Sequence, residues 1–166
     1  MKLTRDDIDI LREHVFPKGL ASSDDAATLL ALNTACPEKC AQWADYFIGE
    51  MTAFIVHHCF PQGSMDDINT RWLIAMISRD GVVSTQVEIE LLRRIIDASR
   101  FVPVALSVFA LKQLDVPRSA AAGTARRRLA TSVMRARGSA LTDLERHLLG
   151  PVPRPRAGVD AQGVAA

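Results

Sequence analysis

Cysteine and histidine are the residue types that most often bind zinc, and five of the seven in this 166-residue chain occur in two groups. Cys36 and Cys40 form the first group, and the run His57–Cys59 forms the second. We expect one helix over residues 37–59, which separates the groups by roughly 25–30 Å at about 1.5 Å per residue. One straight helix therefore cannot bring both groups to a single zinc ion, whose ligand atoms lie about 2 Å away. The sequence favours structural cysteines over a metal centre.

Nucleophilic and acid–base chemistry has little support in the sequence. Cys59 with His14 would supply the residue types of a thiol nucleophile and its base, but no phosphate-binding loop or nucleophile elbow surrounds either residue. Adjacent acids occur where helices are expected to begin, at positions 6–7, 24–25 and 66–67. There they stabilise the positive end of a helix without a catalytic role. We therefore expect a non-enzymatic protein without a cofactor, with a metal-dependent enzyme as a third alternative.

Apolar periodicity predicts an all-α fold of about seven to eight helices. We expect these helices over residues 4–15, 23–34, 37–59, 64–77, 85–98, 103–114, 118–137 and 142–149. Outside the loops, no alternating pattern is long enough to predict a sheet. In the third helix Cys40, Trp43, Phe47, Met51 and Phe54 follow at spacings of three and four. This stripe predicts the face of a central core helix, and a ligand pocket lined by Trp43 and Phe47 is the alternative.

A helix–loop–helix unit recurs along the chain. The loop at Gly81 aligns with a loop at Gly19, 62 residues earlier, and a fainter copy follows at Gly138. The matched pairs are Leu11 with Leu73, Val15 with Ile77, Ser22 with Ser84, Leu29 with Leu91 and Leu30 with Leu92. Glycine allows the positive φ that reverses a chain after a helix. Each glycine precedes a residue that can cap the next helix: Ser22, Ser84 or Thr85, and Thr142.

The second loop has a recognisable pattern in Asp80, Gly81, Val83, Ser84 and Glu88. With these residues the chain resembles EF-hand-like helical proteins and bacterial TerB-type helical domains. The resemblance implies a bacterial all-α repeat protein with EF-hand-like loops. An EF-hand needs oxygen ligands at loop positions 1, 3, 5 and 12 around a glycine at position 6, and at most two survive in any copy. The loops are therefore degenerate, and Asp80 and Glu88 remain as candidate metal ligands.

Composition limits the class of protein. Apolar residues make up 48% of the chain, enough for a packed interior, whereas aromatic residues make up only 5%, too few for a large aromatic binding platform. No apolar run reaches the roughly 20 residues that cross a bilayer, and the charged N-terminus lacks an apolar signal region. An odd number of cysteines, three, suits a reducing compartment. We expect a cytoplasmic protein that does not bind membranes.

Charge is distributed unevenly although the net charge is only +1. Residues 1–115 contain 11 Lys/Arg and 16 Asp/Glu, whereas residues 116–166 contain 9 arginines and 3 acids. The candidate partner-binding residues are Arg126, Arg127, Arg128, Arg135 and Arg137. They are predicted to bind an acidic protein or nucleic acid. A solvated surface, or contact with the acidic units of the same chain, is the alternative.

The helix–loop–helix repeat and the uneven charge together predict three segments. Residues 1–115 form two helix–loop–helix units, residues 116–149 form a third, basic unit, and residues 150–166 form a disordered tail. The predicted function is a cytoplasmic protein-interaction or regulatory module, and a nucleic-acid-binding regulator acting through the basic third is the first alternative. Because the third unit lacks an internal partner, we expect it to pack on the helix over residues 37–59 or to pair across a homodimer.

Overall fold

The computed structural model describes residues 1–117 and 119–150. In this part of the chain the helices are α1 (Arg5–Ile10), α2 (Ser23–Ala35), α3 (Trp43–Thr52), α4 (Asp67–Ile77), α5 (Gln86–Ala98), α6 (Val104–Asp115), α7 (Gly123–Arg137) and α8 (Asp143–Leu149). Two short strands are β1 (Lys2–Leu3) and β2 (Glu38–Lys39). Wider π-helical segments continue α1 over Leu11–Val15 and α3 over Ala53–His58, and a 3-10 turn, Gly138–Ala140, follows α7. The predicted all-α fold is confirmed.

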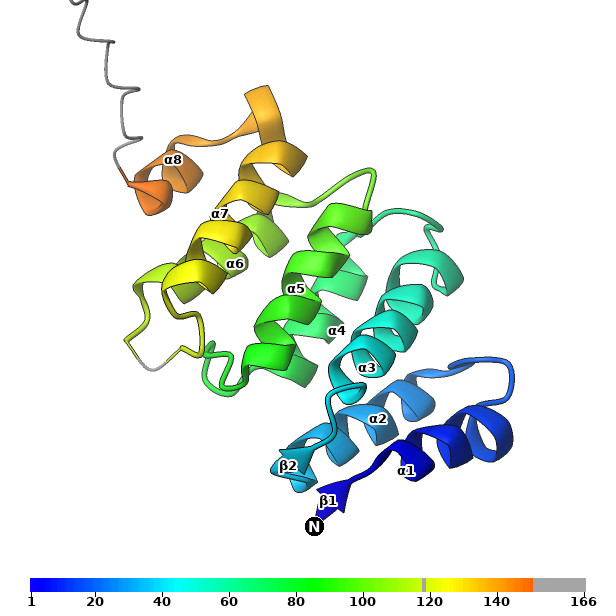
Figure 1. Ribbon diagram of the computed structural model, residues 1–166. Coiled ribbons are helices and arrows are strands. Elements are labelled where there is room, and N and C mark those ends of the chain that lie inside the picture. The colour runs from blue at the N-terminus through cyan, green and yellow to red at the C-terminus, as the bar shows by residue number, and fades with distance from the viewer. Residues whose placement is uncertain (118, 151–166) are drawn as a thin grey trace, which may run out of the picture.

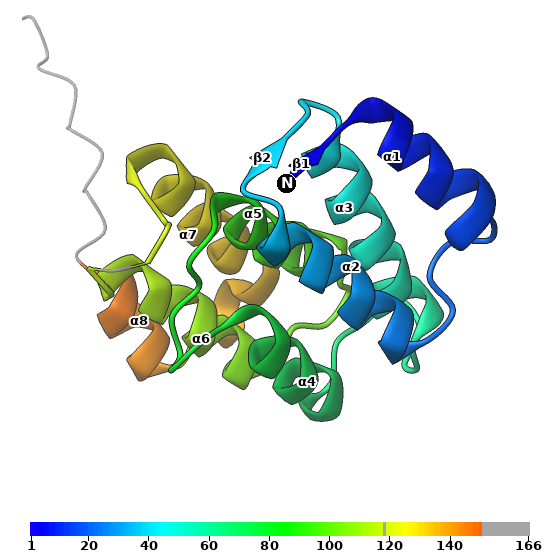
Figure 2. The same ribbon diagram turned by 90° about the horizontal axis from the view of Figure 1, so that it is seen from below.

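The helices lie in two rows (Figure 1, Figure 2). One row contains α1, α3, α5 and α7, and the other contains α2, α4, α6 and α8. In the first row α3 packs on α1 and α5, and α5 packs on α7. In the second row α4 packs on α2 and α6, and α6 packs on α8. The core therefore extends along the molecule by contacts between neighbouring helices. None of the helices in the described residues combines the length and apolar character needed to cross a membrane.

The apolar stripe of α3 lies at the centre of the core. Trp43, Phe47 and Met51 are fully buried, and Phe54 is nearly so. The rings of Trp43 and Phe47 stack with their centroids 5.9 Å apart. Trp43 Nε1 donates a hydrogen bond to Asn33 Oδ1 on α2 (3.0 Å), which satisfies the polar edge of the indole inside the core. The prediction that this stripe is a core face is confirmed for Trp43 to Phe54, whereas Cys40 precedes α3 and is only partly buried.

Local signals start α1, α2, α5 and α8 within one residue of the predicted bounds, whereas α4, expected from residue 64, begins at Asp67 because Asp66 caps it. Capping boxes open α1, α2 and α8, and their cap residues are Thr4, Ser22 and Thr142. Of the two candidates in the second loop, Thr85 caps α5 by accepting a hydrogen bond from the N–H of Glu88. Gly19 and Gly81 take φ values of +76° and +75°, as expected of glycines that reverse the chain. These features depend on sequence neighbours alone.

The helix expected from residue 37 begins instead at Trp43, because Glu38–Lys39 forms β2 and pairs in parallel with β1. The N–H of Cys40 extends this pairing by donating to the carbonyl oxygen of Leu3 (2.9 Å). Leu3 is buried, so the pairing also fixes the N-terminal residues against the core. The expectation of no strand outside the loops was therefore wrong for these four residues.

The bounds of the helices repeat at the 62-residue offset that separates the loops at Gly19 and Gly81. Moving the helical segment 5–15 forward by 62 residues gives 67–77, the bounds of α4. Moving α2 by the same offset gives a range that differs from α5 by one residue at each end. The duplication and the EF-hand-like character of the loops stay predictions.

The third predicted unit packs on the second. Its helix α7 lies against α5 and α6, and α8 lies against α6, so the unit does not dock on α3. The helix expected from residue 118 begins at Gly123. The preceding segment lies against the second loop, where the N–H of Ala120 donates to the carbonyl oxygen of Val83 (3.0 Å). Pairing across a homodimer and the boundary at residue 115 stay predictions, and the tail from residue 151 lies outside the described residues.

A buried ion pair fastens α8 to its neighbours. Arg137 Nε donates to Glu145 Oε1 (2.8 Å), and the two side chains are 8% and 0% exposed. Glu145 also accepts hydrogen bonds from the hydroxyl of Ser107 on α6 and from the N–H of Thr142. Burial of the carboxyl raises its pKa, but the hydrogen bonds from Arg137, Ser107 and Thr142 outweigh burial and lower the pKa from 4.5 to about 2.

Glu145→Gln keeps the side-chain shape but removes the charge that pairs with Arg137. Because a buried guanidinium then lacks its counter-ion, we expect the free energy of unfolding in urea titrations to fall by about 3–5 kcal/mol. Asp143→Asn is the matched control, since it removes a carboxylate of the same helix turn from an exposed pair with Arg146. That change is expected to cost less than about 1 kcal/mol. Equal losses would contradict the role given to Glu145.

The same carboxyl makes stability depend on pH. A carboxyl whose pKa falls on folding stabilises the protein fully above its unfolded pKa, and this contribution is lost as pH falls through the folded pKa. We therefore expect the difference in unfolding free energy between the native chain and Glu145→Gln to be constant at neutral pH and to shrink between pH 4.5 and about 2. Urea titrations over this range measure it, and a difference that persists at pH 2 would refute the assignment.

Candidate functional site

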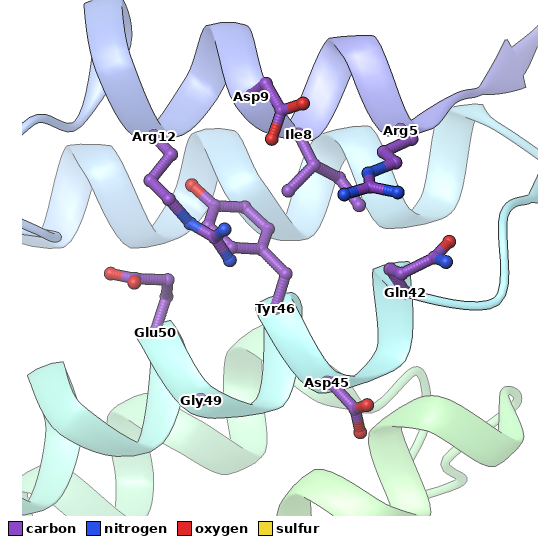
Figure 3. Close-up of a pocket in the computed structure, with 9 residues that line it drawn as sticks. All are labelled: Arg5, Ile8, Asp9, Arg12, Gln42, Asp45, Tyr46, Gly49 and Glu50. Carbon is purple, nitrogen blue, oxygen red and sulfur yellow. The ribbon is translucent and has the colours of Figure 1, made fainter.

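A groove of about 530 Å³ lies between α1 and α3 (Figure 3). It is lined by Arg5, Ile8, Asp9, Arg12, Gln42, Asp45, Tyr46, Gly49 and Glu50. The two helices run in the same direction, so that Arg5 lies toward the end marked by Gln42 and Arg12 toward the end marked by Glu50. A Cβ built on Gly49 would meet no atom within 4 Å. The missing side chain therefore leaves this part of the groove open.

Five of the side chains that line this groove are charged: Arg5, Asp9, Arg12, Asp45 and Glu50. With the residues that the structure describes, none of the five forms an ion pair or a side-chain hydrogen bond. The groove therefore presents charges of both signs that are not neutralised within this part of the molecule. A bound group of complementary charge can pair with them without first breaking an internal ion pair.

Tyr46 forms the floor of the groove between the two arginines (Figure 3). The Arg12 guanidinium lies over its ring, with the Cζ atom 5.3 Å from the ring centroid. The side chain is only 5% exposed, and within the described residues its hydroxyl has no hydrogen-bond partner. Burial raises the pKa of Tyr46 and the Glu50 charge raises it further, whereas Arg12 lowers it, so the hydroxyl is a donor at neutral pH. A buried donor without an acceptor costs about 1–3 kcal/mol.

The predicted arginines of the third unit have separate roles. Arg137 is the buried partner of Glu145 and belongs to the interior. Arg126 is half-buried and donates a hydrogen bond to the carbonyl oxygen of Ala121 at the start of α7. Arg127 is exposed on α7. The structure therefore does not gather all five arginines on one surface.

The remaining two arginines face acidic residues on α5. Arg128 pairs with Glu90 (3.4 Å) and Arg135 with Asp97 (3.9 Å). Arg93 of α5 also binds both acids. Burial raises the pKa of Glu90, but the hydrogen bond and charge of Arg93 and the charge of Arg128 give a net lowering. These two arginines therefore contact acidic residues of the same chain, which is one of the alternatives that the sequence left open.

Asp80 and Glu88, the candidate metal ligands, lie in different environments. Asp80 is exposed in the turn with a φ of +53°. Glu88 is 6% exposed, and its Oε1 accepts a hydrogen bond from Asn33 Nδ2 (3.4 Å), the residue that also binds Trp43. In the part of the chain that the structure describes, no three His, Cys, Asp or Glu side chains come together as a metal site. Metal binding by Asp80 and Glu88 stays a prediction.

The cysteines and histidines are dispersed. Cys36 is buried at the end of α2, Cys40 follows β2, and Cys59 ends the π-helical segment after α3. All three are free thiols. Burial raises the pKa of Cys59, which disfavours the reactive thiolate. The ring of His58 stacks on Phe54 with the centroids 5.7 Å apart, so this histidine has a packing contact.

In comparisons with known proteins, no family model, curated protein or solved structure matches the chain. The resemblance to EF-hand-like and TerB-type domains therefore stays a prediction.

The groove was not predicted from the sequence. Its only signal is that Arg5, Asp9 and Arg12 share one helical face, at spacings of four and three. That pattern is common on solvated helices. The groove exists because α1 lies beside α3, and the position of Gly49 opposite this face depends on how the two helices pack.

Removing the Tyr46 hydroxyl tests its lack of a partner. Because Tyr46→Phe deletes a buried donor that makes no hydrogen bond, we expect it to leave the unfolding free energy unchanged or to raise it by up to about 1 kcal/mol. Ser107→Ala is the matched control, since its buried hydroxyl donates to Glu145. It is expected to cost about 1.5–3 kcal/mol in the same urea titration. A comparable loss for Tyr46→Phe would reveal an internal partner for that hydroxyl.

Proposed function

We propose that this chain is a non-enzymatic protein-interaction module that binds its partner in the groove between α1 and α3. The proposal rests on one observation: charges of both signs line a single groove, without hydrogen-bond or ion-pair partners among the described residues. Isolated charges on a surface are common and solvated. Here they line one concave surface, where a single bound segment can pair with several of them at once.

The two-row packing of helices supports this proposal. Proteins built from helices that contact mainly their neighbours present extended surfaces, and they commonly use such surfaces to bind partners. The groove lies on the row formed by α1, α3, α5 and α7, at the end occupied by the N-terminal helix (Figure 1). A partner bound there would contact α1 and α3 together and would bury charges that are now exposed.

The basic third unit is a weaker candidate for binding nucleic acid. Phosphate binding depends on arginines that are free to neutralise the backbone. Arg137 is buried with Glu145, and Arg128 and Arg135 each face an acid on α5. These acids reduce the positive potential of the α5–α7 surface. The observations therefore favour the α1–α3 groove over this surface.

Reversing the groove arginines tests the proposed function. We expect Arg5→Glu/Arg12→Glu to lower the capture of specific partner proteins from a soluble extract at least about tenfold, because two favourable charge pairs become repulsive. Quantitative mass spectrometry of the captured proteins measures the loss. Arg71→Glu/Lys112→Glu is the matched control, since both residues are exposed on the other row and line no part of the groove. Equal capture by both variants would overturn the proposal.

A further inference from the structure

We infer that the groove recognises a helical segment that presents an acidic, a basic and a second acidic side chain along one face. The inference rests on the proposed function, namely that a protein partner occupies the groove. It is carried by the order of charges on α1 and by the geometry of the two parallel walls.

The α1 wall has a fixed order of charges. Arg5, Asp9 and Arg12 line the groove in that order, which is positive, negative, positive. The two arginines are seven residues apart, which corresponds to about 10 Å along a helix. A complementary segment therefore carries two acids about 10 Å apart with a base between them. This order of signs is the same when the segment binds in the opposite direction.

The opposite wall distinguishes the two ends of the groove. On the α3 side, Gln42 lies at the same end as Arg5, so an acid at this end faces an uncharged residue on the opposite wall. Glu50 lies near Arg12, so an acid at the other end gains less. Asp45 adds negative charge at the α3 edge of the central part, although its side chain points away from α1. The end at Arg5 and the centre at Asp9 therefore contribute most to selectivity.

Helical geometry fits this spacing better than an extended chain. In a helix, residues at i, i+4 and i+7 lie on one face, as Arg5, Asp9 and Arg12 themselves do. In an extended segment, residues three or seven apart point to opposite faces, so the three charges could not all enter the groove. Two parallel helices with a gap between them also form the kind of surface into which the side-chain ridge of a third helix packs.

The Tyr46 ring positions one of the two arginines. The Arg12 guanidinium lies over this ring, so the charge that an acid meets at the Arg12 end is held against α3. The Tyr46 hydroxyl is buried beneath the groove surface, so it is not a contact for the segment.

Two synthetic helical peptides of identical composition test the inference. One places Glu, Lys and Glu at positions i, i+4 and i+7, and the other places Lys, Glu and Glu at the same positions. Fluorescence anisotropy at low ionic strength measures their binding to the full chain. We expect the acid–base–acid peptide to bind at least about tenfold more tightly than the base–acid–acid peptide, and added salt to weaken this difference.

Protein variants assign the difference to the groove. Arg5→Glu/Arg12→Glu is expected to abolish the preference, whereas Arg71→Glu/Lys112→Glu is expected to keep it, with circular dichroism showing equal helix content in all proteins. Equal binding of the two peptides, no binding of either, or a preference that survives the groove variant would overturn the inference. If partner capture still depends on the groove arginines in that case, the interaction function stands and only the helical charge pattern is refuted.

Discussion

Burial of the apolar face of α3 holds helices of both rows in place. Trp43, Phe47 and Met51 contribute large side chains with no exposed surface, and each such burial stabilises the fold by roughly 2–3 kcal/mol. The indole hydrogen bond to Asn33 joins α3 to α2, and Asn33 in turn binds Glu88 on α5. One side of α3 thereby fixes helices of both rows. The opposite side is left to face α1, where it forms a wall of the groove.

The contact between α1 and α3 combines packing with open space. Ile8 of α1 and Tyr46 of α3 are both buried at the base of the groove, so the helices are held together there. Longer charged side chains line the groove above this base, and Gly49 has no side chain to fill it. Close packing at the base and open space above it allow the groove to keep its shape while its charges stay available to a partner.

The C-terminal helices use electrostatics differently. Their buried pair, Arg137 with Glu145, is completed by Ser107, and these hydrogen bonds explain how a fully buried carboxylate stays ionised. The exposed pairs from α7 to Glu90 and Asp97 are longer and more solvated, so they orient the surface more than they stabilise it. Arginine thus has three roles in this structure. Arg137 stabilises the interior, Arg128 and Arg135 pair with acids on α5, and Arg5 and Arg12 line the groove.

Features that depend on near neighbours along the chain could be predicted from the sequence. Periodicity located the helices, cap residues such as Ser22 and Thr142 started them, and Gly19 and Gly81 took the positive φ that their loops require. The stripe from Trp43 to Phe54 was identified as core because helical spacing alone places these residues on one face. Such signals act over a few residues, so they do not depend on the rest of the fold.

Contacts between distant segments could not be predicted, because they depend on how the helices pack. The pairing of β1 with β2 shortened a predicted helix, because hydrogen bonds between segments more than thirty residues apart outweighed local helical preference. The roles of Arg128 and Arg137 depended on whether an acid from another helix lay within reach. The groove likewise needed α1 and α3 to pack side by side. A charge pattern on one helix shows what the helix can bind, whereas packing decides whether that face is covered, neutralised or left open.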